Sequence, residues 1–318
     1  MNNLNLIVKM KFGSKLYGTD TPESDTDYKG VYLPTEEEIL LNRVPKSYNF
    51  MTKQDNESKN TSEDVDIEIY SLHYFIKLAC EGQTVALDML HAPDNMIEEK
   101  SDVWDLIVRH REKFYTKNLQ AFIGYARKQA GKYSIKGSRL DAMNKVLKYL
   151  IMLPPENKIE LYWNVLPRGE HIHDNETDKY GLRLFQVCGT KFQETARVKY
   201  MYEVLNKKYD QYGQRAKDAK ENKNIDWKSV SHALRAAYQI KQILTENTII
   251  FPLKEAEFLK EVKQGKHDYL TVVAPTLENL MDEVEELTKK STLPEKVDMG
   301  FWDGVLMFII GDKVLGSF

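Results

Sequence analysis

In the first ninety residues, short apolar or alternating runs take turns with stretches of helical periodicity, a pattern typical of a domain that mixes strands and helices. Runs rich in β-branched and aromatic residues, or with strict alternation, predict strands over residues 4–12, 27–33 and 65–70. A helix is expected after each of the last two strands. One is headed by Thr35 and three acidic residues, and the other carries an apolar stripe over residues 72–80.

Beyond Pro93 the pattern changes to long amphipathic helices, with β-like pieces only near residues 180–192. The polar segment 42–63 has no period and is expected to form an exposed loop. We therefore predict an α+β fold, in which a mixed sheet with helices over residues 1–93 is followed by a mostly helical region over residues 94–318. The helices predicted in that second region cover residues 101–115, 117–132, 138–152, 197–220, 228–246 and 267–290.

The composition indicates a globular protein and, together with the N-terminal sequence, a cellular compartment. The chain has 318 residues, 42% of them hydrophobic, with 45 basic and 48 acidic side chains and a net charge of −3, which excludes a disordered or fibrous chain. With so little net charge, any polyanion must bind at a local basic patch. Cys80 and Cys188 lie far apart, without metal-ligand spacing. No secretory signal or membrane-length apolar run is found, so we expect a cytoplasmic protein without membrane contact.

A glycine turn and a pair of acids stand close together near the N-terminus. Gly13 and Gly18 follow the first predicted strand and permit a tight turn, where backbone amides and the Ser14 hydroxyl can bind phosphate oxygens. Asp25 and Asp27 are two residues apart, so both carboxylates lie on one face of a strand. Two carboxylates so close repel each other unless a cation binds between them, and oxygen ligands suit Mg²⁺.

A third carboxylate is expected from the strand predicted over residues 65–70. Asp64, Asp66 and Glu68 share the face opposite its apolar residues, and a row of acids on a half-buried strand is costly unless the acids are solvated or metal-bound. We favour Asp66, with Glu68 as the second choice. Three such carboxylates would hold two metal ions, as in-line nucleotidyl transfer requires.

These residues resemble a known signature. The Gly-Ser pair at 13–14 followed by Asp-Thr-Asp at 25–27 resembles that of the DNA polymerase β-like nucleotidyltransferase superfamily. The longer string GSKLYGTDTPESDTDYKGVYLP is similar to a bacterial and phage branch of predicted nucleotidyltransferases, some of them linked to RNA repair. The string DVDIEIYSLHYFIKLA is similar to that branch's third-carboxylate strand and following helix, and DWKSVSHALRAAYQIKQIL to its C-terminal helical motif.

The resemblance implies roles for individual residues. Gly13 and Ser14 would bind the triphosphate of an NTP, and Asp25, Asp27 and Asp66 would be the catalytic, metal-binding residues for two Mg²⁺ or Mn²⁺ ions. The first region would be the catalytic nucleotidyltransferase domain, and the helical region would bind the substrate and acceptor.

Basic side chains of the helical region form a second group of candidates. In KQAGKYSIKGSRL they either bind phosphate or RNA or form a solvated helix face, and the resemblance favours Lys136 and Arg139 as nucleotide-binding residues. Arg235 shares a polar helix stripe with His232 and Gln239. Either Arg235 contacts a phosphate or base, or the stripe forms hydrogen bonds at the surface or between domains. The resemblance favours Arg235 as a nucleotide-binding residue.

The leading hypothesis is a two-metal enzyme that transfers an NMP from an NTP to a hydroxyl and releases pyrophosphate. The expected acceptor is an RNA 3′ end, such as that of a tRNA. One alternative keeps the chemistry but places the acceptor on a protein or small molecule. A second alternative is an NTP-binding module without turnover. No P-loop, nucleophile elbow or GxGxxG motif supports a kinase, hydrolase or dinucleotide enzyme.

Overall fold

The chain folds into two compact units, and the division differs from the expected boundary at residue 93. The first region's sheet continues past that residue, because a strand at 97–100 pairs with the first strand of the chain. The C-terminal helices also return to the first unit. The first unit comprises residues 1–131 and 226–318, and the second comprises residues 132–225. The computed structural model describes residues 4–52, 61–117, 137–220, 222–223 and 225–316.

The first unit contains a five-stranded mixed sheet of order β3-β4-β2-β1-β5. Neighbouring strands run antiparallel except β2 and β4, which are parallel. The three predicted strands are present, and the α+β class is confirmed. β3 falls in segment 42–63, expected as a loop, although Tyr48 and Phe50 alternate with Ser47 and Asn49. β5 is a short polar edge strand that shows no alternation. The bounds are β1 (Asn5–Lys11), β2 (Thr26–Leu33), β3 (Ser47–Met51), β4 (Val65–Ser71) and β5 (Ile97–Lys100).

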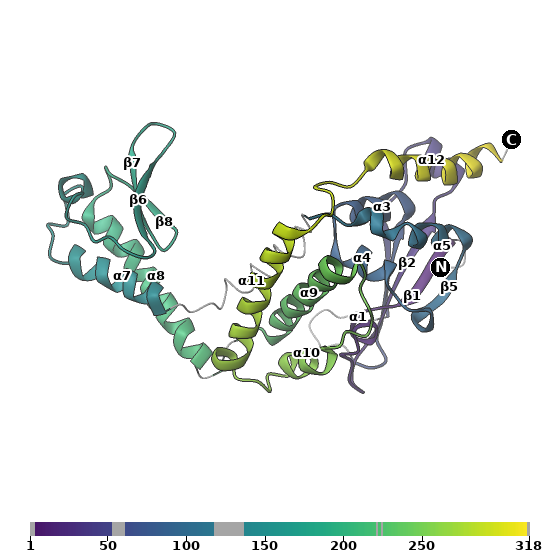
Figure 1. Ribbon diagram of the computed structural model, residues 1–318, viewed down its shortest axis with the longest axis horizontal. Coiled ribbons are helices and arrows are strands. Elements are labelled where there is room, and N and C mark those ends of the chain that lie inside the picture. Colours follow the sequence, from purple (N-terminus) through teal and green to yellow (C-terminus); the bar gives the residue numbers. More distant parts are fainter. Residues whose placement is uncertain (1–3, 53–60, 118–136, 221, 224, 317–318) are drawn as a thin grey trace. The chain divides into compact units, whose positions relative to one another are not determined.

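Helices cover this sheet and extend the unit (Figure 1). The bounds are α1 (Gly13–Tyr17), α2 (Glu36–Leu40), α3 (Leu72–Cys80), α4 (Thr84–Leu90), α5 (Asp102–Arg109), α9 (Trp227–Glu246), α10 (Ala256–Lys263), α11 (Ala274–Lys290) and α12 (Met299–Leu315), with 3₁₀ turns at Asp94–Met96 and Arg111–Phe114 and a π-helical turn at Tyr269–Val273. Helices α4 and α10 are too short to show a period, and α12 is apolar on all sides, so the sequence pattern does not predict them.

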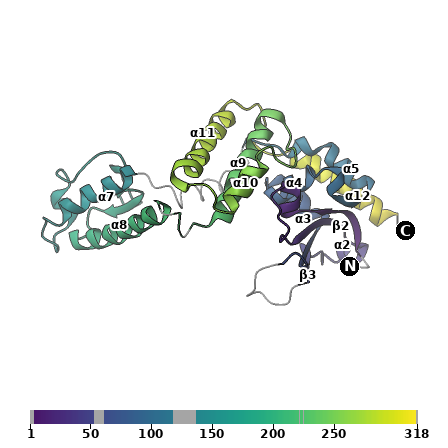
Figure 2. The ribbon, with the colours of Figure 1, turned by 90° about the horizontal axis from the view of Figure 1, so that it is seen from below.

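Aromatic contacts join the helices to the sheet. The ring of Phe75 on α3 lies 5.3 Å from that of Trp104 on α5, so these two helices cover the same face. Trp302 of α12 stacks on Phe114 at 3.8 Å, which fixes the C-terminal helix against the N-terminal part of the unit. Helix α9 packs against both α10 and α11, and α9 and α11 run side by side in both views (Figures 1 and 2). This packing gives α9 a fixed place in the first unit.

The second unit pairs two helices with a small antiparallel sheet of order β6-β7-β8. Its buried core includes Trp163, Phe185 and Val187. The predicted helices at 138–152 and 197–220 are present, whereas most of the helix predicted at 117–132 lies outside the described residues. The bounds are α7 (Gly137–Leu150), β6 (Ile172–Thr177), β7 (Arg183–Val187), β8 (Thr190–Gln193) and α8 (Val198–Lys220), with a 3₁₀ turn at Ile159–Tyr162. In the described part of the chain, no helix has the length and apolar character needed to cross a membrane.

Candidate active site

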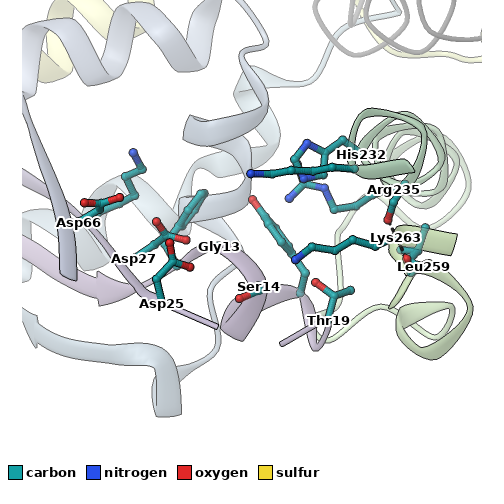
Figure 3. A pocket seen from close by; sticks show the side chains of 15 residues that line it. Gly13, Ser14, Thr19, Asp25, Asp27, Asp66, His232, Arg235, Leu259 and Lys263 are labelled. Atoms are coloured by element: carbon teal, nitrogen blue, oxygen red, sulfur yellow. Dashed lines mark hydrogen bonds between the residues drawn. The ribbon is translucent and has the colours of Figure 1, made fainter. Parts of the chain in front are cut away.

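Three carboxylates, from β2, from β4 and from the residue before β2, converge at one end of the β2/β4 pair. These strands run parallel with Asp27 directly opposite Asp66, and Asp25 immediately precedes β2. One ligand oxygen of each residue lies within 4.8 Å of those of the other two. Figure 3 shows the three side chains grouped on one side of a pocket. The structure therefore brings together the three acids that the sequence analysis predicts.

The charges of this acid cluster disfavour its fully ionised form in the absence of a cation. Burial raises the pKa of Asp27, the negative charges of Asp25 and Asp66 raise it further, and Lys29 opposes them. All three acids are half-buried, so water screens their repulsion only in part. A divalent cation relieves such repulsion, and a set of carboxylate oxygens is the donor set that Mg²⁺ and Mn²⁺ prefer. The residues present thus fit the expected metal ions.

Glu68, the second choice for the third carboxylate, has other partners. It forms an ion pair with Lys29 at 2.6 Å and accepts a hydrogen bond from the Tyr70 hydroxyl at 2.6 Å. Burial alone would raise the pKa of Glu68, but the hydrogen bonds from Lys29 and Tyr70 lower it below its ordinary value. The three-carboxylate cluster does not include Glu68.

Gly13 and Ser14 begin α1 directly beside the acids. Gly13 has a φ of +61°, and a Cβ added to it would lie only 1.9 Å from Oδ2 of Asp27. Glycine is therefore required twice, for the backbone conformation and for the space that the carboxylate occupies. Ser14 lines the same pocket, and its carbonyl accepts a hydrogen bond from the Thr19 amide at 2.9 Å.

Across a cavity of about 370 Å³, the acids face a wall of basic side chains. Lys228, His232 and Arg235 come from α9, and Lys263 comes from the end of α10. We refer to these four residues as the basic wall. Figure 3 shows His232, Arg235 and Lys263 on the side of the pocket opposite the acids. Arg235 is among the residues predicted at the site, whereas the sequence marks His232 only as part of a polar stripe. Lys228 extends that stripe by one helical turn, which is the signal that identifies it, whereas no sequence pattern marks Lys263.

The basic wall is electropositive and partly shielded from water. Burial, followed by the positive charges of Arg235, Lys228 and Lys263, lowers the pKa of His232 to about 4, so its ring is neutral at pH 7. Burial and the Lys228 charge lower the pKa of Lys263, although the nearby acids oppose this shift. A polyanion bound here would relieve the repulsion among these cations.

Comparison with known proteins decides the family. The chain is 40% identical over 324 residues to an uncharacterized 38.9 kDa protein in the nrdC-mobD intergenic region of Enterobacteria phage T4, with 94% of this chain and 95% of that protein covered. Residues 1–155 match the model of the RNA repair pathway DNA polymerase beta family. The chain belongs to this polymerase β family. Membership indicates nucleotidyl transfer as the reaction class. No solved structure gives a significant match.

In this polymerase β family protein, Arg235 contacts Tyr17 and the buried residue Asp88. Its guanidinium lies 3.6 Å from the centre of the Tyr17 ring and 3.8 Å from the Asp88 carboxylate. Asp88 also accepts hydrogen bonds from the Tyr17 hydroxyl at 2.8 Å and the Gln239 amide at 2.7 Å. Burial raises the pKa of Asp88 to about 6, and Arg235 is the strongest opposing influence. The α9 stripe thus contributes both a pocket cation and hydrogen bonds between helices.

The two other predicted nucleotide-binding residues belong to the second unit of this family member. Lys136 lies outside the described residues. Arg139 is near the start of α7, where its carbonyl accepts a hydrogen bond from the Cys188 thiol at 3.4 Å. Their roles stay predictions.

Proposed function

We propose that the protein is a metal-dependent nucleotidyltransferase that transfers an NMP from an NTP to a hydroxyl acceptor and releases pyrophosphate. One observation carries this proposal: the carboxylates of Asp25, Asp27 and Asp66 converge in a pocket whose opposite side is basic. Acids to hold metal ions and cations to bind phosphates are the two groups that this chemistry requires.

The acid cluster and the basic wall have different roles in the proposed reaction. Asp25, Asp27 and Asp66 would hold two Mg²⁺ or Mn²⁺ ions, which when bound activate the attacking hydroxyl and neutralise charge on the phosphates. Gly13 leaves the Asp27 carboxylate its space, and the Ser14 hydroxyl is a donor for a phosphate oxygen.

The basic wall would bind the triphosphate. Lys228, Arg235 and Lys263 supply positive charge, and the neutral His232 ring can donate one hydrogen bond. Because these groups line one half-enclosed pocket, their attraction for phosphate is screened less than that of exposed lysines. We propose an NTP bound with its phosphates between the acids and this wall.

The distribution of charge supports RNA as the acceptor. The second unit, residues 132–225, carries 18 Lys and Arg residues against 12 Asp and Glu residues, a net charge of +6. The rest of the chain carries 27 against 36, a net charge of −9. Such asymmetry within one chain favours a polyanionic partner at the basic part, which also contains Lys136 and Arg139. We propose that this part of the helical region binds the acceptor RNA, in the cytoplasm of a bacterium or a phage-infected host.

The test follows a labelled α-phosphate to its acceptor. The protein is incubated with each α-labelled NTP, Mg²⁺ or Mn²⁺, and total RNA, purified tRNA, a protein fraction or a small-molecule fraction. Label should enter RNA, and Asp27→Asn should abolish the transfer, whereas Asp94→Asn, an exposed acid outside the pocket, should not. Label confined to protein or small molecules would overturn the RNA acceptor. NTP binding without pyrophosphate release would indicate a non-catalytic module.

A further inference from the structure

A buried carboxylate lies behind the proposed nucleotide site, where three helices meet. Asp88 of α4 is fully buried, as is Gln239 of α9. One carboxylate oxygen accepts the Gln239 amide proton at 2.7 Å, and the other accepts the Tyr17 hydroxyl proton at 2.8 Å. The guanidinium of Arg235 approaches that second oxygen at 3.8 Å. Residues from α1, α4 and α9 therefore depend on one acidic group.

Packing alone does not explain an acid at this position. Burial disfavours the charged form of Asp88 and raises its pKa to about 6. Replacing a buried ionic group by a well-packed apolar one is often neutral or stabilising, so such a group is weak evidence for a purely stabilising role. The Asp88 carboxylate instead orients its neighbours, since its two oxygens accept hydrogen bonds from side chains on two different helices.

The partners of Asp88 belong to the two sides of the pocket. Tyr17 is the last residue of α1, the helix that begins with Gly13 and Ser14. Arg235 belongs to the basic wall, and its side chain is only 13% exposed. The guanidinium lies 3.6 Å from the Tyr17 ring centre, so the ring and the carboxylate together restrict a side chain that otherwise has many rotamers.

We propose that Asp88 is a positioning residue for the nucleotide site. It holds Arg235 against Tyr17 and so fixes the Gly13-Ser14 turn relative to the basic wall. The inference rests on the proposed function, because it assumes that an NTP binds between these two elements. Asp88 itself does not line the pocket, and it acts through Arg235 and Tyr17.

The test compares nucleotide affinity and turnover in Asp88→Asn and wild-type protein. The dissociation constant of a non-hydrolysable NTP with Mg²⁺, and the KM for the NTP, should rise about tenfold, as expected for a weakened charge-assisted contact. The kcat should change by less than about threefold, because the metal-binding acids are untouched. In an Arg235→Ala background, Asp88→Asn should add almost nothing, because the two residues act as one unit.

A structural role alone predicts a different result. Tyr115→Phe removes a buried hydrogen bond to His91, the residue after α4, and serves as the matched control. It should lower the melting temperature without changing the nucleotide affinity. If Asp88→Asn behaves like this control, or if its effect on affinity multiplies with that of Arg235→Ala, the inference is overturned.

A Tyr17 variant and the NMR signals of Arg235 give two further tests of the role of Asp88. If Asp88→Asn does not fold, Tyr17→Phe removes the hydroxyl bonded to Asp88 but keeps the ring, and it should still weaken NTP binding. Because the Arg235 guanidinium lies 3.6 Å from the Tyr17 ring centre, the ring current should displace the Arg235 side-chain proton resonances in the wild type. In either variant these resonances should move toward their unperturbed positions. NTP binding without label transfer would refute the proposed function alone, and an unchanged affinity would refute the role of Asp88 alone. A wild-type protein that binds no NTP would overturn both.

Discussion

Gly13 and Asp27 are coupled, because the space that a side chain at residue 13 would fill holds the Asp27 carboxylate. The two residues lie on different elements, α1 and β2. The backbone amide of Phe12, the residue before α1, donates a hydrogen bond to the Asp27 carbonyl at 2.8 Å. Any side chain at residue 13 would displace a proposed metal ligand.

Gly13→Ala is therefore expected to abolish metal-dependent activity. The added Cβ would lie 1.9 Å from Oδ2 of Asp27, so the carboxylate must move. The matched control is Gly189→Ala, which has a φ of +81° but no atom within 4 Å of the added carbon. Both variants should lose about 1 kcal/mol of stability from backbone strain. Only Gly13→Ala should weaken Mn²⁺ binding, measured by electron paramagnetic resonance, and equal Mn²⁺ affinities would contradict this interpretation.

The imidazole of His232 should report the bound phosphates. Burial and the cations around it lower its pKa to about 4 in the free protein. A nearby polyanion favours the protonated ring, so an NTP analogue with Mg²⁺ should raise the His232 pKa by at least about one unit. His91, whose pKa burial also lowers to about 4, lies outside the pocket and should not respond. Histidine NMR titrations measure both, and a pKa of His232 that does not change would argue against phosphates at the basic wall.

The acids and the α9 part of the basic wall carry a signal in the sequence, but Lys263 at the end of α10 does not. The spacing of Asp25 and Asp27 predicts one shared face because strand alternation is a local property. Choosing Asp66 over Glu68 depends on strand register, which places Asp27 opposite Asp66 and Lys29 opposite Glu68. The sequence favours Asp66 and the resemblance agrees, but the alternating pattern alone leaves Glu68 open, because register between distant strands is not a local property.

At the scale of elements, α9 has the largest share in the site. Its apolar face packs on α10 and α11, and its polar stripe faces the pocket and α4. The periodicity predicts α9 itself, including the buried positions Val230, Ala233 and Leu234. It does not predict α4 or α10, which are short and are defined by tertiary packing. The sequence pattern therefore does not identify Asp88 and Lys263, the residues of those two helices that lie near the polar stripe of α9.

The junction between α4 and α9 should make stability depend on pH. The pKa of Asp88 is about 6 in the folded protein, above its ordinary value of 3.8, so folding favours its protonated form. Its contribution to the free energy of unfolding is therefore full below about pH 4 and declines as the pH rises through 6. Relative to Asp88→Asn, the wild type should lose up to about 3 kcal/mol between pH 4 and pH 7. Urea unfolding of both proteins measures this difference, and a difference that stays constant with pH would contradict the prediction.

At the scale of the whole molecule, the small net charge of −3 conceals two units of opposite sign. The composition alone argues weakly against a nucleic-acid partner, because it averages an acidic first unit with a basic second unit. The opposite net charges become visible only when the chain is divided at the boundaries of the two units, which the hydrophobic pattern does not reveal.

RNA affinity should therefore depend on cations of the second unit. Lys207 and Lys208 form an exposed pair on α8, and Lys289 and Lys290 form an exposed pair on α11 of the first unit. Replacing the first pair by serine should weaken RNA binding and reduce the slope of log K against log salt by about 0.7 for each lost phosphate contact. The same change in the second pair should have little effect. Equal effects from both pairs, measured by filter binding at several salt concentrations, would contradict a role specific to the second unit.

The most direct test of nucleotidyl transfer at the acid cluster is a single-turnover measurement with an α-labelled NTP, Mg²⁺ and RNA. Wild-type protein should transfer label to RNA and release pyrophosphate in equal amounts, and chelation of the metal should stop both. Asp25→Asn, Asp27→Asn and Asp66→Asn should each reduce the rate by at least about 100-fold, whereas Asp94→Asn should match the wild type. Transfer that persists in the three variants, or that needs no metal ion, would contradict the proposed function.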